Sequence, residues 1–322
     1  MNNADALTKQ YVRRPQVFAD LFNHLMYGGQ PVLKPEDMTE MDPAELAFPF
    51  GGDGKISAVQ KYRDAVKQVV SMQDGKAAYL LVLGIENQTN VHYAMPARNM
   101  LYDALNYASQ IGRIARHHRQ SGDLASGGEF LSGMTASDRL VPVITLVVYF
   151  GQTEWDGPTS LHEMLETRDE TVLKYTPDYR INLIAPISMS EEETESFHSD
   201  FRLLAGMIRT CRDKTAMSRL LQTEDFRHMD PLTAAVANEV TSSKLRLTTN
   251  EKGEVDMCIA MQEILEDAKY EGKIEGKIEG ALEMLCKLVQ QNILSPEVAA
   301  AQSGRPLSDF NAAYIRFLSS QA

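Results

Sequence analysis

Residues 62–88, YRDAVKQVVSMQDGKAAYLLVLGIENQ, hold the pattern that decides the fold. Two runs rich in aliphatic and β-branched residues lie on either side of the dipeptide Asp74-Gly75. Asp-Gly between two such runs is the strongest short-range signal for a β-hairpin. The pattern therefore predicts two antiparallel strands, of which the first begins near Asp64 and the second ends at Glu86-Asn87-Gln88.

Polar side chains at the ends of this hairpin could form a site. Glu86 and Gln88 are two residues apart, and side chains alternate faces along a strand, so both point to one side. A two-residue Asp74-Gly75 turn would place Asp64 opposite Ile85. One additional residue in the turn, or one bulge, would place Asp64 opposite Glu86 instead. We predict the second register, in which two carboxylates meet where a divalent metal could bind.

Composition and charge exclude several classes of protein. The 322 residues suffice for one large domain or two smaller ones, and no apolar run approaches the ~20 residues that span a bilayer. The N-terminal residues lack the apolar segment of a secretory signal, so we expect a cytoplasmic protein with no membrane partner. The net charge of −12 argues against bulk electrostatic binding to DNA, although it leaves room for a local basic groove. Three widely spaced cysteines argue against a zinc site.

The order of elements around the hairpin predicts an α/β fold. A helix is expected over residues 15–27, ended by Gly28-Gly29. A second helix is expected to follow His92–Pro96 and to run to about Arg119. The almost unbroken apolar run 140–150 reads as a strand buried on both faces, and strand–helix–strand order implies a parallel crossover. Residues 179–187 supply one further strand.

The second helix is expected to carry both a packing face and a ligand face. Arg98 and Tyr102 lie near its start and hence near the strand end at Glu86, where a cation and a phenol could hold a phosphate or remain solvated surface residues. The basic cluster 113–119 at its far end could equally complement the helix C-terminus. The predicted inward stripe consists of Ala97, Leu101, Ala104, Ala108, Ile111 and Ala115.

Two connecting segments are predicted to be irregular. Residues 30–55 are rich in proline, glycine and acids, with one helical turn expected at 42–46. Residues 121–139 are rich in glycine and serine and are expected to form a loop. The run 51–55, GGDGK, lacks the spacing of a phosphate-binding loop, so we do not assign that role to it.

The chain is predicted to have three parts: a core over 1–189, a helical scaffold over 190–253, and a long helix with a small helical cap over 254–322. A four-residue repeat in the long helix sets Gly272, Gly276 and Gly280 roughly in one row, drifting about 40° per repeat. Each glycine weakens a helix by about 1 kcal/mol relative to alanine. The segment is therefore expected either to fray as a linker or to pack closely on a second backbone and form a homo-oligomer. The helices after residue 295 could also form a helix-turn-helix, but they carry few basic residues.

Several motifs resemble those of the Rpn-type recombination-promoting nuclease and putative transposase family (YhgA-like), whose core is similar to that of the PD-(D/E)xK nucleases. The resemblance spans about residues 10–290. It implies a restriction-endonuclease-like core of helix, β-hairpin, strand, crossover helix and strand, followed by a helical C-terminal region. It also implies a metal-dependent DNA endonuclease with a role in recombination or mobile elements. The matching motifs are Phe18–Asn23, Tyr62–Asp64, Gly84–Thr89, His92–Tyr102 and Glu154–Pro158.

The resemblance implies that Asp64 and Glu86 are the two acids that hold Mg²⁺, with Mn²⁺ or Ca²⁺ as alternatives. Gln88 stands where the wider superfamily has lysine. Glutamine carries no charge to stabilise a transition state, but it can orient a water molecule.

Two further metal ligands are considered from the residues themselves. The Asn87 carbonyl would complete the metal shell at the strand edge. Asp20, on the first helix, is either a solvated polar residue or a third acid for the metal.

Two functional hypotheses follow. In the first, the protein is a Mg²⁺-dependent DNA endonuclease, a hydrolase whose partner is DNA. In the second, it is a catalytically silent relative that binds DNA or protein and assembles through the glycine-containing helix.

Overall fold

The computed structural model of the chain describes residues 3–40, 44–47, 59–62, 65–71 and 79–319. It separates into two compact units, Met1–Cys258 and Ile259–Ala322. The boundary between them falls within helix α11 (Met257–Gln290).

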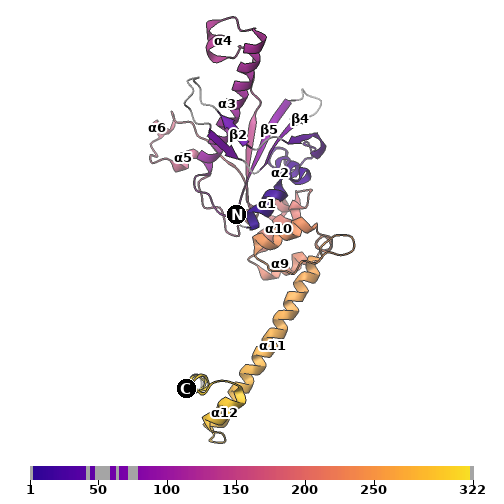
Figure 1. Ribbon diagram of the computed structural model, residues 1–322, viewed down its shortest axis with the longest axis vertical. Coiled ribbons are helices and arrows are strands. Elements are labelled where there is room, and N and C mark those ends of the chain that lie inside the picture. Colours follow the sequence, from indigo (N-terminus) through magenta and orange to yellow (C-terminus); the bar gives the residue numbers. More distant parts are fainter. Residues whose placement is uncertain (1–2, 41–43, 48–58, 63–64, 72–78, 320–322) are drawn as a thin grey trace. The chain divides into compact units, whose positions relative to one another are not determined.

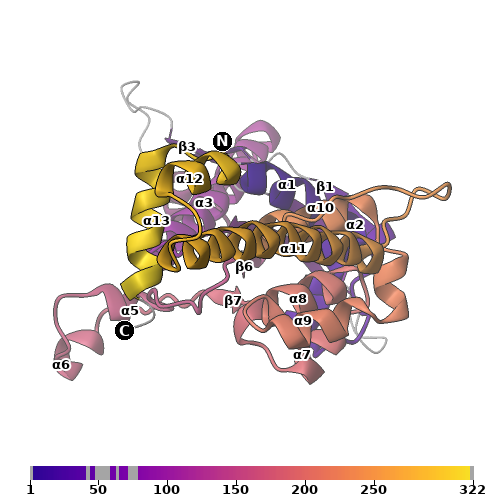
Figure 2. The same ribbon diagram turned by 90° about the horizontal axis from the view of Figure 1, so that it is seen from below.

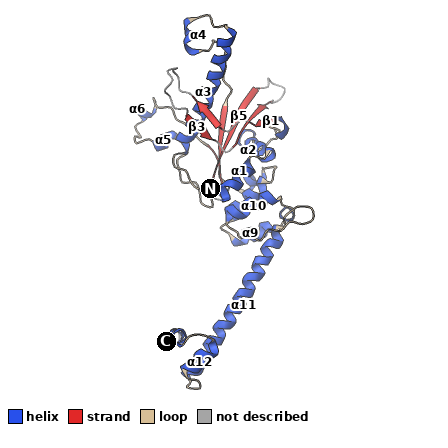
Figure 3. Ribbon diagram, viewed as in Figure 1, coloured by secondary structure: helices blue, strands red, loops and turns tan. Residues whose placement is uncertain are grey.

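The first unit is built on a five-stranded mixed sheet with strand order β1-β4-β5-β6-β7 (Figures 1 and 3). Strands β1, β4 and β5 are antiparallel neighbours, whereas β5, β6 and β7 run parallel. The strand bounds are Met38–Glu40 (β1), Ala65–Ser71 (β4), Tyr79–Gln88 (β5), Val143–Tyr149 (β6) and Asn182–Ile184 (β7). This sheet confirms the mixed α/β class, the central hairpin and the parallel crossover.

The register of the hairpin is the predicted one. Ala65 pairs with Ile85 and Val66 with Gly84, one residue away from the pairing that a two-residue turn would impose. The turn residues and Asp64, which directly precedes Ala65, lie outside the described residues.

A second sheet pairs β2 (Ala44–Ala47) with β3 (Val59–Tyr62). The helical turn predicted at 42–46 is therefore wrong over residues 44–46, which are extended. Residues 41–43 and the GGDGK run 51–55 lie outside the described residues. Helix α3 (Met95–Ser121) packs against β2.

Helices cover both faces of the five-stranded sheet (Figure 1). On one face, Asn87 donates a hydrogen bond to Thr8 Oγ1 of α1 (Asn3–Val12) over 2.6 Å. The Lys67 ammonium on the same face lies 5.3 Å from the ring centroid of Phe18 in α2 (Pro15–Tyr27). Burial lowers the pKa of Lys67, and the carboxylate of Glu40, 3.5 Å away, partly opposes that shift. Helix α3 covers the opposite face, where Thr145 of β6 donates to its Asp103.

The predicted packing face of α3 is wrong in its first half, although Ala115 near its end is buried as predicted. Leu101 and Ala104 are exposed, whereas the buried face is largely polar. Its polar members are Asn99, Tyr102, Asp103, Asn106 and Gln110. Spacing of apolar residues indicates a helix face only when the partner surface is apolar, and here the sheet presents polar groups to the helix.

The segment after α3 is more ordered than a loop. It contains helix α4 (Gly127–Ser132), which Ser126 and Glu129 close with a reciprocal capping box. Gly133, at φ 71°, lies so close to Ala115 of α3 that an added Cβ would stand 2.4 Å from the Ala115 Cβ. The segment therefore folds back on the end of α3.

The remaining helices of the first unit lie after β6, and α8 and α9 are neighbours in Figure 2. The helical scaffold predicted over 190–253 is not helical at residues 196–200. Ser190 and Glu193 form a reciprocal capping box just before this break. The bounds of these remaining helices are Leu161–Met164 (α5), Glu170–Leu173 (α6), Glu191–Glu195 (α7), Phe201–Thr210 (α8), Lys214–Leu221 (α9) and Pro231–Thr241 (α10). Short 3-10 turns span Pro35–Asp37, Pro186–Ser188 and Glu224–Arg227.

The second unit packs the end of α11 against two short helices, α12 (Pro296–Ser303) and α13 (Leu307–Ser319). Its buried core consists of Cys286, Val289, Ala299, Ala300 and Phe310. Gly304, at φ 67°, permits the sharp turn that follows α12. Among the described residues, no helix is long and apolar enough to cross a membrane.

Candidate functional site

The end of strand β5 carries a buried ionic cluster of Glu86, Arg98 and Tyr102. The Glu86 side chain is fully buried, and its Oε2 lies 3.0 Å from Nη2 of Arg98, which is about one-third exposed. Arg98 Nε donates to the Tyr102 hydroxyl over 3.1 Å. The structure thus brings these three predicted residues together at the start of α3.

Two neighbours of Glu86 follow the alternation of the strand. Gln88 lies on the same face as Glu86 and pairs in register with Tyr149 of β6. The Asn87 side chain points to the opposite face, where it meets Thr8. Asn87 could therefore contribute to a site at Glu86 only through its backbone. The predicted partner acid, Asp64, lies outside the described residues.

A buried polar network continues from this cluster along α3. Asp103 accepts hydrogen bonds from Thr145 Oγ1 over 2.6 Å and from the Tyr179 hydroxyl over 2.5 Å. It thereby links α3 to β6 and to the segment that precedes β7. Asn99 lies between this network and Arg98 in the sequence and is also fully buried. Sequence reasoning missed these residues, although polar side chains recur at helical spacing through positions 99, 103, 106 and 110.

A pocket of about 580 Å³ opens where β5 and β6 end. Residues at or just after the ends of the two strands line it, among them Asn90, Tyr149 and Thr153. Tyr93 donates to the carboxylate of Asp156 over 3.1 Å, and this contact raises the pKa of Tyr93. Carboxyl ends of parallel strands are where open α/β sheets place their ligands. The pocket and the Glu86 cluster therefore mark the same end of the sheet.

The sequence of this region matches a known protein family. The family described as "putative transposase, YhgA-like" matches residues 59–233, more than half of the 322 residues. The chain belongs to this family. No curated protein and no solved structure matches it. The match runs from β3 into α10, so it includes the hairpin, Glu86, Arg98 and the parallel strands.

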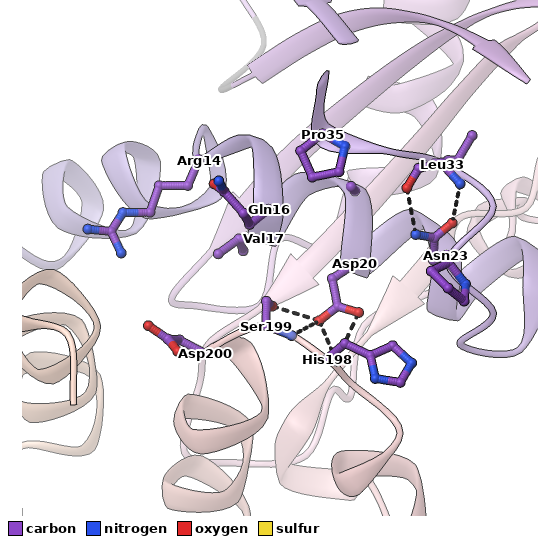
Figure 4. Close-up of a pocket in the computed structure, with 12 residues that line it drawn as sticks. Arg14, Gln16, Val17, Asp20, Asn23, Leu33, Pro35, His198, Ser199 and Asp200 are labelled. Atoms are coloured by element: carbon purple, nitrogen blue, oxygen red, sulfur yellow. Dashed lines mark hydrogen bonds between the residues drawn. The ribbon is translucent and has the colours of Figure 1, made fainter. Parts of the chain in front are cut away.

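In this member of the YhgA-like family, Asp20 lies apart from the Glu86 cluster and binds His198 and Ser199 (Figure 4). Helix α2 lies on the other face of the sheet, and the Asp20 carboxylate accepts hydrogen bonds from three donor groups in residues that precede α8. His198 N donates over 2.9 Å, Ser199 N over 2.7 Å and Ser199 Oγ over 2.6 Å. Asp20 therefore anchors the start of α8 to α2, a role that depends on a segment 178 residues away.

The surroundings of Asp20 form a separate cavity of about 400 Å³. Asn23 closes one side through two hydrogen bonds with the backbone of Leu33, over 2.8 and 2.9 Å (Figure 4). On another side, Arg14 makes a two-point ion pair with Asp230 at 2.7 and 3.1 Å. The side chains of Arg14, Asp20 and Asn23 thus hold other parts of the chain, which is typical of a structural junction.

The side chains near Glu86 can be compared with the ligands that a divalent cation requires. Mg²⁺ prefers carboxylate and carbonyl oxygens, and Glu86 supplies a carboxylate at the strand edge. Within the part of the chain that the structure describes, no group of three or more His, Cys, Asp or Glu side chains is arranged to hold a metal ion. A metal at Glu86 would therefore depend on Asp64 as its second acid.

Proposed function

We propose that the protein is a metal-dependent DNA endonuclease that hydrolyses phosphodiester bonds and acts in recombination or mobile-element biology. The observation that carries this proposal is the buried carboxylate of Glu86 beside Arg98 and Tyr102, at the end of a central strand in a YhgA-like chain. The element order α2, β4–β5, α3, β6 also supports the restriction-endonuclease-like core that the resemblance implies.

In this proposal, Glu86 and Asp64 hold Mg²⁺, and the Asn87 carbonyl contributes a further oxygen. The cation would neutralise phosphate charge and lower the pKa of a bound water. Arg98 would exchange part of its contact with Glu86 for a phosphate oxygen, because its guanidinium is about one-third exposed. Tyr102 orients Arg98 through the hydrogen bond to Nε. Gln88, on the same face as Glu86, would orient the attacking water.

Nicking of supercoiled plasmid DNA tests the proposal. The purified full chain is expected to convert supercoiled to open circular DNA with Mg²⁺ or Mn²⁺ and to stop when EDTA is added. A chain that binds DNA but leaves the plasmid intact with Mg²⁺, Mn²⁺ and Ca²⁺ would contradict hydrolysis and favour the silent-relative hypothesis.

One observation favours a role for the C-terminal helix in assembly. An added Cβ at Gly276 or Gly280 would meet no other atom within 4 Å, and Ile278 and Met284 on the same helix are more than half exposed. Within the second unit, the described residues therefore do not cover this part of the glycine row. The surroundings of Gly272 lie outside the described residues.

The double substitution Gly276→Leu/Gly280→Leu separates packing from fraying. The helix alone should tolerate it and gain stability, by up to about 1 kcal/mol per glycine replaced, whereas a closely packed second backbone would be pushed away. We expect a lower molar mass in light scattering. Lys277→Leu/Ala281→Leu is the matched control on another side of the helix, and an equal mass for both pairs would exclude the glycine row as the interface.

A further inference from the structure

Three exposed arginines on one side of α3 form what we call the arginine stripe: Arg113, Arg116 and Arg119. Within the described residues, none of the three makes an ion pair. An acidic chain with a net charge of −12 nevertheless concentrates these cations within two turns of helix. The helix dipole accounts for cations only in the last turn. It therefore explains Arg119, two residues before the end of α3, but neither Arg113 nor Arg116.

Acidic residues near the stripe are held by internal hydrogen bonds. Asp123 and Asp138 lie on either side of His118, at 2.8 Å from Nδ1 and 2.9 Å from Nε2. These contacts raise the pKa of His118, which favours the imidazolium. The Glu129 carboxylate accepts from the backbone N–H groups of Ala125 and Ser126 over 2.6 and 2.8 Å. The negative charges of this segment are thus engaged locally, while the arginines face solvent.

Helical geometry aligns the stripe with the Glu86 cluster. Arg116 follows Arg98 by 18 residues, or about five complete turns, so the two point to the same side of α3. Arg113 and Arg119 lie about 60° to either side of Arg116. The rise along the helix from Arg98 to Arg116 is about 27 Å, roughly eight base pairs of one duplex strand at 3.4 Å each.

The far end of α3 is also held in place. Figure 1 shows α4 at the tip of α3, where Gly133 packs on Ala115 and His118 binds both flanking aspartates. The arginines therefore stand on a supported helix, which lowers the entropic cost of ordering them on a ligand.

We infer that the arginine stripe binds the phosphate backbone of duplex DNA about 27 Å from the phosphate held at Arg98. The inference rests on the proposed action on DNA and adds a second, sequence-independent contact surface. Phosphate contacts of this kind position a duplex without reading its sequence.

Salt dependence of binding tests the stripe. Fluorescence anisotropy with a labelled 30-base-pair duplex, in EDTA and over a series of KCl concentrations, should give a linear fall of log K with log[KCl]. For Arg113→Gln/Arg116→Gln/Arg119→Gln, the slope should be shallower by about 2.7, or about 0.9 for each lost phosphate contact. The matched control is Arg212→Gln/Lys214→Gln/Arg219→Gln, which removes the same charge from exposed positions elsewhere.

Each outcome of the salt-dependence measurement either supports or overturns the binding of DNA by the arginine stripe. A shallower slope in the stripe variant with an unchanged control supports the stripe. Equal slopes in both variants, or no duplex binding by the unsubstituted chain, would overturn it. The binding measurement is made in EDTA and does not depend on cleavage. If the unsubstituted chain does not nick DNA but the slopes of the two triple variants still differ, the result counts against hydrolysis and not against the stripe. Circular dichroism melts should confirm that both triple variants fold.

Discussion

Replacing Glu86 by glutamine is expected to reduce Mg²⁺-dependent plasmid nicking at least ~100-fold. The substitution keeps the shape of the side chain but removes the charge that would hold the cation. A metal supplies several kcal/mol of transition-state stabilisation, and each 1.36 kcal/mol is about tenfold in rate. DNA binding in EDTA should change little.

Glu86→Gln should also leave the fold intact. Glutamine fills the same buried space, and Arg98 is about one-third exposed and can stay hydrated. Removing one partner of a fully buried ion pair costs about 3–5 kcal/mol, and the one-third exposure of Arg98 should reduce this cost for Glu86→Gln. Glu195→Gln is the control, because Glu195 pairs with Arg202 at 2.9 Å on the surface. Nicking by Glu86→Gln at the rate of the unsubstituted chain would remove Glu86 from the mechanism.

Replacing Asp20 by alanine is expected to destabilise the first unit by about 3 kcal/mol. The carboxylate accepts from two backbone N–H groups and one hydroxyl at residues 198–199, and hydrogen bonds to a charged group each contribute about 1.5–3 kcal/mol without full additivity. The melting temperature should fall by roughly 6–12 °C, measured by differential scanning calorimetry. Asp20→Asn, which keeps one acceptor oxygen, should lose less.

Substitutions of Asp20 and Glu86 should therefore have different effects on nicking and on stability. Asp20→Asn, assayed below its melting transition, is expected to keep Mg²⁺-dependent nicking, whereas Glu86→Gln loses it. A loss of nicking in Asp20→Asn with an unchanged melting temperature would place Asp20 at the metal after all.

The pattern of charged residues in the sequence could not by itself show whether a carboxylate binds metal or holds the fold together. Asp20 lies on the polar side of a short helix, which is compatible with solvent, metal or a buried junction. Its actual partners, His198 and Ser199, are far away in the sequence, and no local pattern of residues predicts them. The buried face of α3 presents the same difficulty, because Asp103 is satisfied by Thr145 and Tyr179 from two other segments.

Local chemistry was sufficient for the central hairpin, for helix α2 with its Gly28 end, and for the parallel strand after α3. Asp-Gly turns, strand alternation and helix-end signals act over a few residues, and the handedness of crossovers is general. The site residues Glu86, Arg98 and Tyr102 could be predicted from the sequence for the same reason, since each lies near the end of a predictable element.

The sequence by itself determined the order of the central elements α2, β4, β5, α3 and β6. It left two registers of the hairpin open, and the pairing of Ala65 with Ile85 decided between them. Only the tertiary structure decided which side of α3 is buried and that Asp20 binds the start of α8. The physical reason is that apolar burial follows local periodicity, whereas a buried polar group is stable only with partners that the folded chain brings from a distance.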